Sequence, residues 1–119
     1  MTSIAFQEES TSQGTLPVAQ DPLSSLTTEG VLEGLAEPAH LTKFRTVVGR
    51  RNADVVVNDP DVSRQHAVIE RYGNRYLIRD LGSTNGTFVN GRKIEAEMLQ
   101  PRDIIEVGGT RLVFRLELL

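Results

Sequence analysis

Two polar segments in the middle of the chain carry the residue types that bind phosphate groups. Residues 59–64 (DPDVSR) and residues 82–87 (GSTNGT) are compact and rich in hydroxyl, amide and guanidinium groups, and residues 49–51 add a glycine and two arginines. A site for a phosphate dianion needs an arginine fork, short hydroxyls and backbone amides left free by tight turns. If the three segments meet, they form such a site, because each charged hydrogen bond contributes about 1.5–3 kcal/mol.

Catalytic and metal-dependent chemistries fit the same residues poorly. Ser63 and His66 lack a G-x-S-x-G elbow, and residues three apart on a strand point to opposite faces. Asp54, Asp59 and Asp61 do not have the spacing of a calcium-binding loop. The glycines near residue 82 lack the Gly-Lys-Ser/Thr of a P-loop. We therefore expect no enzyme activity, no metal and no cofactor.

The candidate residues also have simpler interpretations, which the sequence leaves open. Arg50 and Arg64 are equally typical of an ordinary protein surface. Ser63 is a common turn residue that bonds its own backbone, and Asn85 suits a positive φ angle. Nucleic-acid binding is not supported, because aromatic residues make up only 5% of the chain and no Lys/Arg stripe is present.

The elements that must position these residues are short strands joined by turns. β-Branched and aromatic runs recur after residue 42, and Gly, Asn, Asp and Pro separate them. Strands are expected at residues 46–48, 54–57, 66–72, 75–80, 87–89, 104–107 and 111–118. Hairpins are expected at residues 73–74 and 108–109, and turns at residues 85–86 and 90–91, the two ends of the strand at 87–89. Leu112, Phe114, Leu116 and Leu118 should share one face of the last strand. This pattern predicts an all-β fold, an antiparallel β-sandwich.

The first 42 residues give weaker signals. Residues 1–23 are rich in Ser, Thr and Gln, and we expect a flexible, disordered acidic tail there and a folded domain at residues 24–119. Residues 31–33 could form a turn between two strands, because Gly30 and Gly34 bracket them. Residues 31–35 could instead form a short helical turn.

The charge distribution is uneven along the chain. Residues 1–40 contain six acids and no Lys or Arg, whereas the remaining residues hold all 13 basic residues. This asymmetry fits either an acidic arm that contacts a mildly basic body or a solvated tail. There is no cysteine, no secretory signal and no apolar stretch long enough to span a bilayer. We expect a cytoplasmic protein that contacts neither membrane nor nucleic acid.

Four motifs in register resemble the forkhead-associated (FHA) domain. They are Gly-Arg at 49–50, Ser-Arg-Gln-His at 63–66, Asp-Leu-Gly-Ser-Thr-Asn-Gly-Thr at 80–87 and Asn-Gly at 90–91, and the likeness extends to a closing hairpin near residues 102–103. The resemblance covers residues 26–118. It implies a sandwich of about eleven strands whose loops at one end bind a phosphothreonine peptide.

The resemblance also implies a role for individual residues. The phosphopeptide would be bound by the following residues: Arg50, Ser63, Arg64 and Thr84 at the phosphate, and Asn85 at the peptide backbone. Gly49, His66, Gly86 and Asn90 would support the site, with His66 bracing the Ser63 loop and Asn90 tethering the loop that presents Thr84.

Two functional hypotheses follow from the resemblance. In the first, the chain is a phosphothreonine-dependent adaptor or regulator in Ser/Thr kinase signalling, and its partner is a phosphorylated protein such as a kinase or its substrate. In the second, the same face docks a folded protein without phosphate. The arm adds a regulatory hypothesis, because Thr11, Thr15, Thr27 and Thr28 would lie in it. Phosphorylation of Thr27 or Thr28 would then close the arm onto its own domain or a neighbour's.

Overall fold

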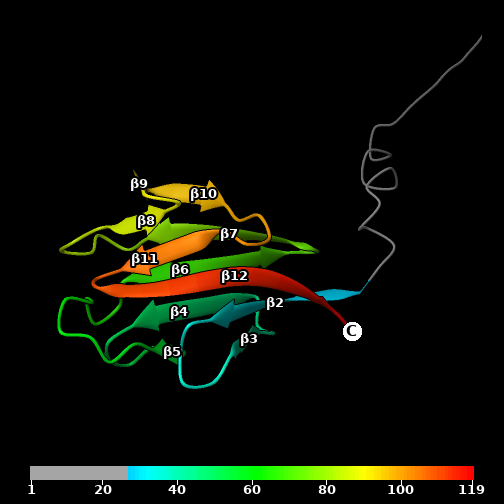
Figure 1. The fold of residues 1–119 in the computed structure, drawn as a ribbon, viewed down its shortest axis with the longest axis horizontal. Coiled ribbons are helices and arrows are strands. Elements are labelled where there is room, and N and C mark those ends of the chain that lie inside the picture. The colour runs from blue at the N-terminus through cyan, green and yellow to red at the C-terminus, as the bar shows by residue number, and fades with distance from the viewer. Residues whose placement is uncertain (1–26) are drawn as a thin grey trace, which may run out of the picture.

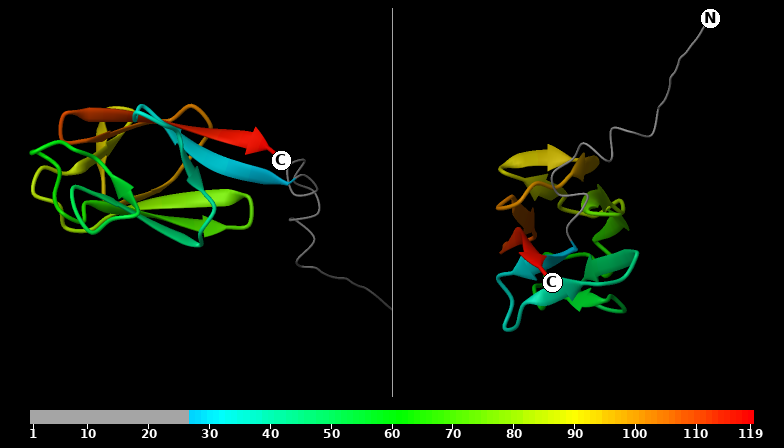
Figure 2. Two further views of the ribbon diagram at one scale, coloured as in Figure 1. Left: turned by 90° about the horizontal axis from the view of Figure 1, so that it is seen from below. Right: turned by 90° about the vertical axis from the view of Figure 1, so that its right-hand side faces the viewer.

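The computed structural model describes residues 27–119, which form two β-sheets packed face to face (Figure 1, Figure 2). The predicted flexible tail, residues 1–23, lies outside the described residues, as do Thr11 and Thr15. The strands are β2 (Thr28–Glu33), β3 (Ala39–Leu41), β4 (Arg45–Gly49), β5 (Val55–Val56), β6 (Ala67–Tyr72), β7 (Arg75–Asp80), β8 (Thr87–Val89), β9 (Arg92–Ile94), β10 (Ala96–Met98), β11 (Ile104–Val107) and β12 (Thr110–Leu118). The predicted all-β sandwich is confirmed.

The two sheets differ in size and in the order of their strands. One is five-stranded, in the order β10-β7-β6-β4-β5, and the other is six-stranded, in the order β3-β2-β12-β11-β8-β9. All neighbouring strands are antiparallel except β4 and β5, which run parallel, with Val48 opposite Val55. The sandwich is therefore mixed at this edge, where a purely antiparallel one was expected.

The core lies between the sheets. It is built from the inward-facing residues, which alternate with outward-facing residues along each strand. Tyr76 of β7 is 1% exposed, and Leu112 and Phe114 of β12 are 0% and 1% exposed. Leu116 packs at the edge of this core, whereas Leu118 is 66% exposed and lies beyond it. The apolar face predicted for the last strand is thus confirmed as far as Leu116.

The two predicted hairpins are present, and the turn predicted at residues 90–91 forms a third. Strands β6 and β7 turn at residues 73–74, β8 and β9 at residues 90–91, and β11 and β12 at residues 108–109. Asn90 and Gly91 both have positive φ angles, 51° and 83°, as the tight turn between β8 and β9 requires.

Residues 28–33 form one continuous strand, so both predictions for residues 31–35, the turn and the helical turn, are wrong. Gly30 is not a turn residue but the point at which β2 crosses the two aromatic rings of the core. A Cβ atom there would lie 2.8 Å from the Tyr76 ring and 2.9 Å from the Phe114 ring, and the Gly30 amide donates to Tyr76 Oη at 2.7 Å. The glycine allows this close approach of backbone to ring.

The expected hairpin near residues 102–103 is also absent from the described structure. Strand β10 pairs with β7 in one sheet, whereas β11 pairs with β12 and β8 in the other. Residues 99–103 therefore carry the chain from one sheet to the other.

The sandwich has two distinct ends (Figure 1). At the loop end lie residues 50–54, 57–66 and 81–86 and the turn at 108–109. At the terminal end lie the first and last described residues, where Leu119 N donates to Thr27 O at 3.0 Å. No helix among residues 27–119 is long and apolar enough to cross a membrane.

Candidate functional site

Three loops meet at the loop end and bring the predicted site residues together. The first, residues 50–54, joins β4 to β5. The second, residues 57–66, joins β5 to β6, and we call it the serine loop. The third, residues 81–86, joins β7 to β8, and we call it the threonine loop.

Strand β4 and the serine loop approach each other closely at Gly49. A Cβ atom at Gly49 would lie 1.9 Å from the Arg64 carbonyl oxygen, so only glycine fits. Arg50 then donates from its backbone nitrogen to Ser63 O (3.0 Å) and from Nε to Val62 O (2.9 Å). Within residues 27–119 its two terminal nitrogens have no acceptor, so this side of the guanidinium is available to a ligand.

A hydrogen bond joins the serine and threonine loops at the two hydroxyl residues predicted to contact phosphate. The Thr84 backbone nitrogen donates to Ser63 Oγ at 3.0 Å. Because this oxygen already accepts a bond, the Ser63 hydroxyl proton remains available to an outside acceptor. Ser63 is half-buried and Thr84 is exposed, so a ligand can reach both.

His66 supports this contact from below. Its side chain is fully buried, Nδ1 accepts from the Ser63 backbone nitrogen at 3.1 Å, and Nε2 lies 2.8 Å from the Gly86 carbonyl oxygen. These partners assign a neutral imidazole with its proton on Nε2. Since the ring contacts the Ser63 amide and the Ser63 hydroxyl contacts Thr84, the pair has no nucleophile–base hydrogen bond.

A single carboxylate organises the threonine loop. Asp80 accepts from the Ser83 backbone nitrogen at 3.0 Å, from Ser83 Oγ at 2.5 Å and from Thr87 Oγ1 at 2.7 Å. The Gly86 nitrogen donates to Ser83 Oγ at 2.9 Å and closes the loop. Partial burial raises the pKa of Asp80, but the hydrogen bonds from Ser83 and Thr87 outweigh it and hold this pKa below the ordinary value.

A second carboxylate, Asp59, holds the serine loop. Its Oδ1 accepts from the Asp61 nitrogen at 2.9 Å, and its Oδ2 accepts from the Gly109 nitrogen at 2.9 Å and from Thr110 Oγ1 at 2.7 Å. The backbone hydrogen bond from Asp61, followed by that from Thr110, lowers the pKa of Asp59. The serine loop is thereby fixed to the turn between β11 and β12.

Asn85 and Arg64 complete the surface of the site. Asn85 Nδ2 donates to the Asp61 carbonyl oxygen at 2.8 Å and so ties the two loops together a second time. Arg64 is exposed, and its guanidinium has no partner within residues 27–119. The contacts of both residues with a peptide stay predictions.

These three loops fall inside the span that matches a family model. The model described as "FHA domain" matches residues 46–108, which is more than half of the chain. The chain belongs to the FHA domain family. The matched span begins in β4 and ends after β11, so it contains all three loops of the site.

Two curated relatives of this FHA domain are regulatory proteins by name. An oxoglutarate dehydrogenase inhibitor of Corynebacterium jeikeium is 41% identical over 75 residues, which cover 62% of this chain and 52% of the relative. The glycogen accumulation regulator GarA of Mycolicibacterium smegmatis is 37% identical over 70 residues, which cover 58% of this chain and 44% of the relative. The chain thus spans about half the length of the curated relatives it matches.

Solved FHA structures share the fold. A domain studied for phosphothreonine-dependent FHA interactions is 30% identical, with a TM-score of 0.72 over 76% of this chain and 99% of that one. EmbR of Mycobacterium tuberculosis, solved in complex with a low-affinity phosphopeptide, is 33% identical, with a TM-score of 0.69 over 73% of this chain and 24% of that one.

Two of the threonines assigned to the arm lie elsewhere in this FHA domain. Thr28 is the first residue of β2, is 2% exposed and donates from Oγ1 to Asn74 Oδ1 at 3.0 Å. The expectation that Thr28 is an accessible arm residue is therefore wrong. Thr27 is exposed, but its carbonyl is bonded to Leu119 at the terminal end, remote from the serine and threonine loops (Figure 1).

Asn90 also acts elsewhere than expected. Its side chain donates from Nδ2 to Asp103 Oδ1 at 2.9 Å and accepts from the Ile104 nitrogen at 3.0 Å. It therefore ties the turn between β8 and β9 to the start of β11, and not to the loop that presents Thr84.

The sequence analysis assigned no site role to Asp59 or Asp80, the two carboxylates that hold the loops. The local sequence held one signal for each residue. Aspartates in turns commonly accept a hydrogen bond from a backbone amide a few residues further on, and Asp59 does so from Asp61 and Asp80 from Ser83. The long-range bonds of Asp59 to Gly109 and Thr110 left no trace in the local sequence.

Proposed function

We propose that this FHA domain binds a phosphothreonine-containing segment of a partner protein through Arg50, Ser63, Arg64, Thr84 and Asn85. It acts as a regulator or adaptor in Ser/Thr kinase signalling, and it is a binding module rather than an enzyme. The observation that carries the proposal is the hydrogen bond from the Thr84 backbone nitrogen to Ser63 Oγ, because the Ser63 carbonyl also accepts from the Arg50 nitrogen and the three residues are thereby brought together.

The chemistry of this arrangement favours a dianion. A phosphorylated threonine carries a charge of about −1.5 to −2 at neutral pH and three acceptor oxygens. The site offers three groups that can donate: the free side of the Arg50 guanidinium, the Ser63 hydroxyl proton and the exposed Thr84 hydroxyl. An unmodified threonine would leave the Arg50 charge without its acceptor, so affinity depends on the phosphate.

The relatives suggest the kind of partner. The names of two of them, oxoglutarate dehydrogenase inhibitor and glycogen accumulation regulator, describe proteins that control metabolism. We propose a similar regulatory role for this chain, with a phosphorylated kinase, a kinase substrate or a metabolic enzyme as partner. The proposed site of action is the cytoplasm.

The test compares three versions of one threonine peptide library: phosphothreonine, phosphoserine and unmodified. Fluorescence anisotropy measures the affinity of wild type, Arg50→Ala and the matched control Arg45→Ala. Arg45 begins the strand that Arg50 follows and is exposed at the opposite end. A melting curve of each variant checks that the sandwich is folded.

We expect binding of the phosphothreonine peptides, weaker binding of phosphoserine and none of the unmodified peptides. Loss of one or more charged hydrogen bonds in Arg50→Ala should weaken binding about 10- to 150-fold. Arg45→Ala should bind as wild type does. Binding that survives phosphatase treatment or Arg50→Ala would instead support the phosphate-independent docking scaffold.

A further inference from the structure

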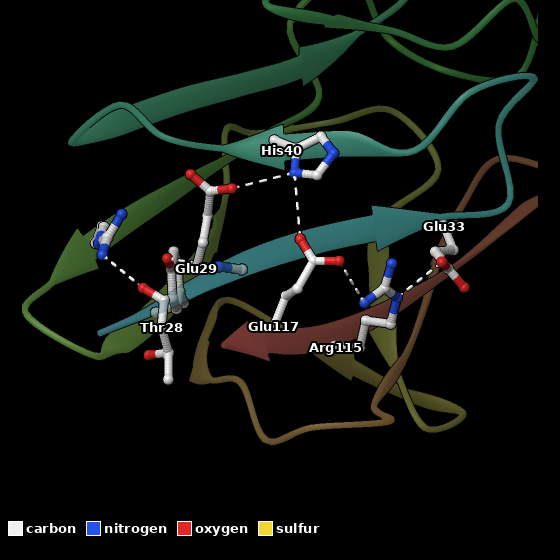
Figure 3. A network of polar contacts seen from close by, with 9 residues as sticks. Thr28, Glu29, Glu33, His40, Arg115 and Glu117 are labelled. Carbon is white, nitrogen blue, oxygen red and sulfur yellow. Dashed lines mark hydrogen bonds and ion pairs between the residues drawn. The ribbon is translucent and has the colours of Figure 1, made fainter. Parts of the chain in front are cut away.

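Three metal-ligating side chains meet on the outer face of the six-stranded sheet (Figure 3). They are Glu29 of β2, His40 of β3 and Glu117 of β12, and one ligand atom from each lies within 4.8 Å of the others. His40 Nδ1 is 3.1 Å from Glu29 Oε1 and 3.9 Å from Glu117 Oε1. Two carboxylates thus face the same imidazole nitrogen.

Strand register forces the two carboxylates together. Glu29 is directly opposite Glu117 in the ladder between β2 and β12, and like charges in such a pair destabilise a sheet. His40 and Arg115 flank Val31, the next outward-facing residue of β2. Val31 is 0% exposed although it faces away from the core, so neighbouring side chains cover it, while His40 and Glu117 keep 48% and 38% of their own side-chain surface exposed.

Arg115 neutralises only part of the negative charge of the carboxylates around His40. It donates from Nε to Glu33 Oε2 at 2.7 Å and from Nη1 to Glu117 Oε2 at 3.4 Å. The guanidinium balances only one of the three carboxylates, so the group carries two negative charges when His40 is neutral. Arg115 also holds one oxygen of Glu117 and turns the other towards His40, as an outer residue does for a metal-binding carboxylate.

We propose that Glu29, His40 and Glu117 bind a divalent transition-metal ion of the zinc class. In a tetrahedral zinc site the ligands lie about 2.0–2.2 Å from the metal, and hence about 3.3–3.5 Å from one another. The separations of 3.1 and 3.9 Å from Nδ1 lie on either side of this value, and all three ligand atoms lie within 4.8 Å of one another. One imidazole with two carboxylates suits zinc better than magnesium, which prefers oxygen ligands alone.

The ion would connect three neighbouring strands. His40 lies on the edge strand β3, which has three residues and pairs only with β2 in the described sheet. Metal binding would fix this short edge to β2 and β12 and remove the repulsion between the two glutamates. The cluster lies towards the terminal end, away from the serine and threonine loops (Figure 1), so it is independent of the proposed peptide site.

The test is a calorimetric titration of Zn²⁺ into the untagged, chelator-treated full chain. The variants are His40→Ala and Glu117→Gln. Glu106→Gln is the matched control, because Glu106 of the same sheet also faces an arginine at 3.4 Å, Arg111, but lies outside the cluster. A melting curve follows folding, and Mg²⁺ replaces Zn²⁺ in a parallel titration.

We expect one Zn²⁺ per chain for wild type and Glu106→Gln, and affinity reduced at least about tenfold in His40→Ala and Glu117→Gln. Zinc should shift the imidazole nitrogen resonances of His40 and leave those of His66, the other of the two histidines, unchanged. It should also raise the melting temperature of wild type. The proposal is overturned by wild type without saturable binding, by unchanged affinity in His40→Ala, or by equal binding of Mg²⁺.

Discussion

The serine loop and the threonine loop are each organised by their own aspartate, which accepts three hydrogen bonds. The two aspartates differ in how far along the chain their donors lie. Asp80 bonds Ser83 and Thr87, all within one turn and the strand that follows it. Asp59 bonds Gly109 and Thr110, which lie 50 and 51 residues further along the chain. The threonine loop is therefore built by its own sequence, whereas the serine loop depends on a hairpin of the other sheet.

This difference predicts how the loss of each aspartate should affect folding and ligand binding. Loss of Asp80 leaves buried donors unpaired and should affect folding and binding together. The donors to Asp59 are exposed or part-buried and can bond water instead, so loss of Asp59 should affect binding more than folding. The four predictions below test this contrast.

Replacement of Asp80 should have the largest effect. Asp80→Ala leaves the Ser83 amide and the fully buried Thr87 hydroxyl without an acceptor, so the free energy of unfolding should fall by about 2–4 kcal/mol. Urea denaturation measures the loss. Asp80→Asn, which keeps one acceptor oxygen, should lose less, and an Asp80→Ala domain as stable as wild type would contradict the role of this network.

Replacement of Asp59 should act mainly on the ligand. Asp59→Ala releases the serine loop from the turn at 108–109, and phosphopeptide affinity should weaken roughly 2- to 30-fold through displacement of Ser63. Peptide anisotropy and urea denaturation, measured on the same preparation, separate the two effects. A fall in stability as large as that of Asp80→Ala would erase the difference between the loops.

Acid should weaken the fold through these same carboxylates. The pKa values of Asp80 and Asp59 are lower in the folded chain than the ordinary value of 3.8. Their contribution to stability is complete above the unfolded pKa and is lost as the pH falls below about 4 through the folded pKa. The contribution of these two carboxylates to the free energy of unfolding should therefore be constant from pH 7 to about 5 and decline below 4, and the decline should be less steep in Asp80→Asn.

The smallest effect should come from Thr110. Thr110→Val keeps the shape of the side chain and removes one of the three donors to Asp59. Phosphopeptide affinity should change less than about threefold, because two backbone donors remain on this carboxylate. An effect equal to that of Asp59→Ala would show that the hydrogen bond from Thr110 alone holds the serine loop.

The parts of the fold that were predicted correctly are those that depend on neighbouring residues in the sequence. The alternation of Leu112, Phe114 and Leu116 and the turn at Asn90-Gly91 follow from strand period and from positive φ angles, which neighbouring residues decide. The Ser63 and Thr84 segments were recognised from their residue types, and the structure joins them by a hydrogen bond.

Three of the failures have one cause, which is a partner remote in the sequence. Gly30 is determined by Tyr76 and Phe114, and Asn90 by Asp103, so neither role is visible among adjacent residues. Thr28 was assigned to the arm because its neighbourhood is polar, but its pairing with Leu118 and its bond to Asn74 place it in a sheet. Such contacts emerge only when the two sheets are packed.

The hydrogen bond between Leu119 and Thr27 holds the first and last described residues of the domain together. Residues 27 and 119 therefore lie at the same end of the sandwich, opposite the serine and threonine loops (Figure 1). Tension applied between these two residues would not pass through the loops of the proposed peptide site. The same closeness makes the domain a good candidate for circular permutation, with a short linker across residues 119 and 27.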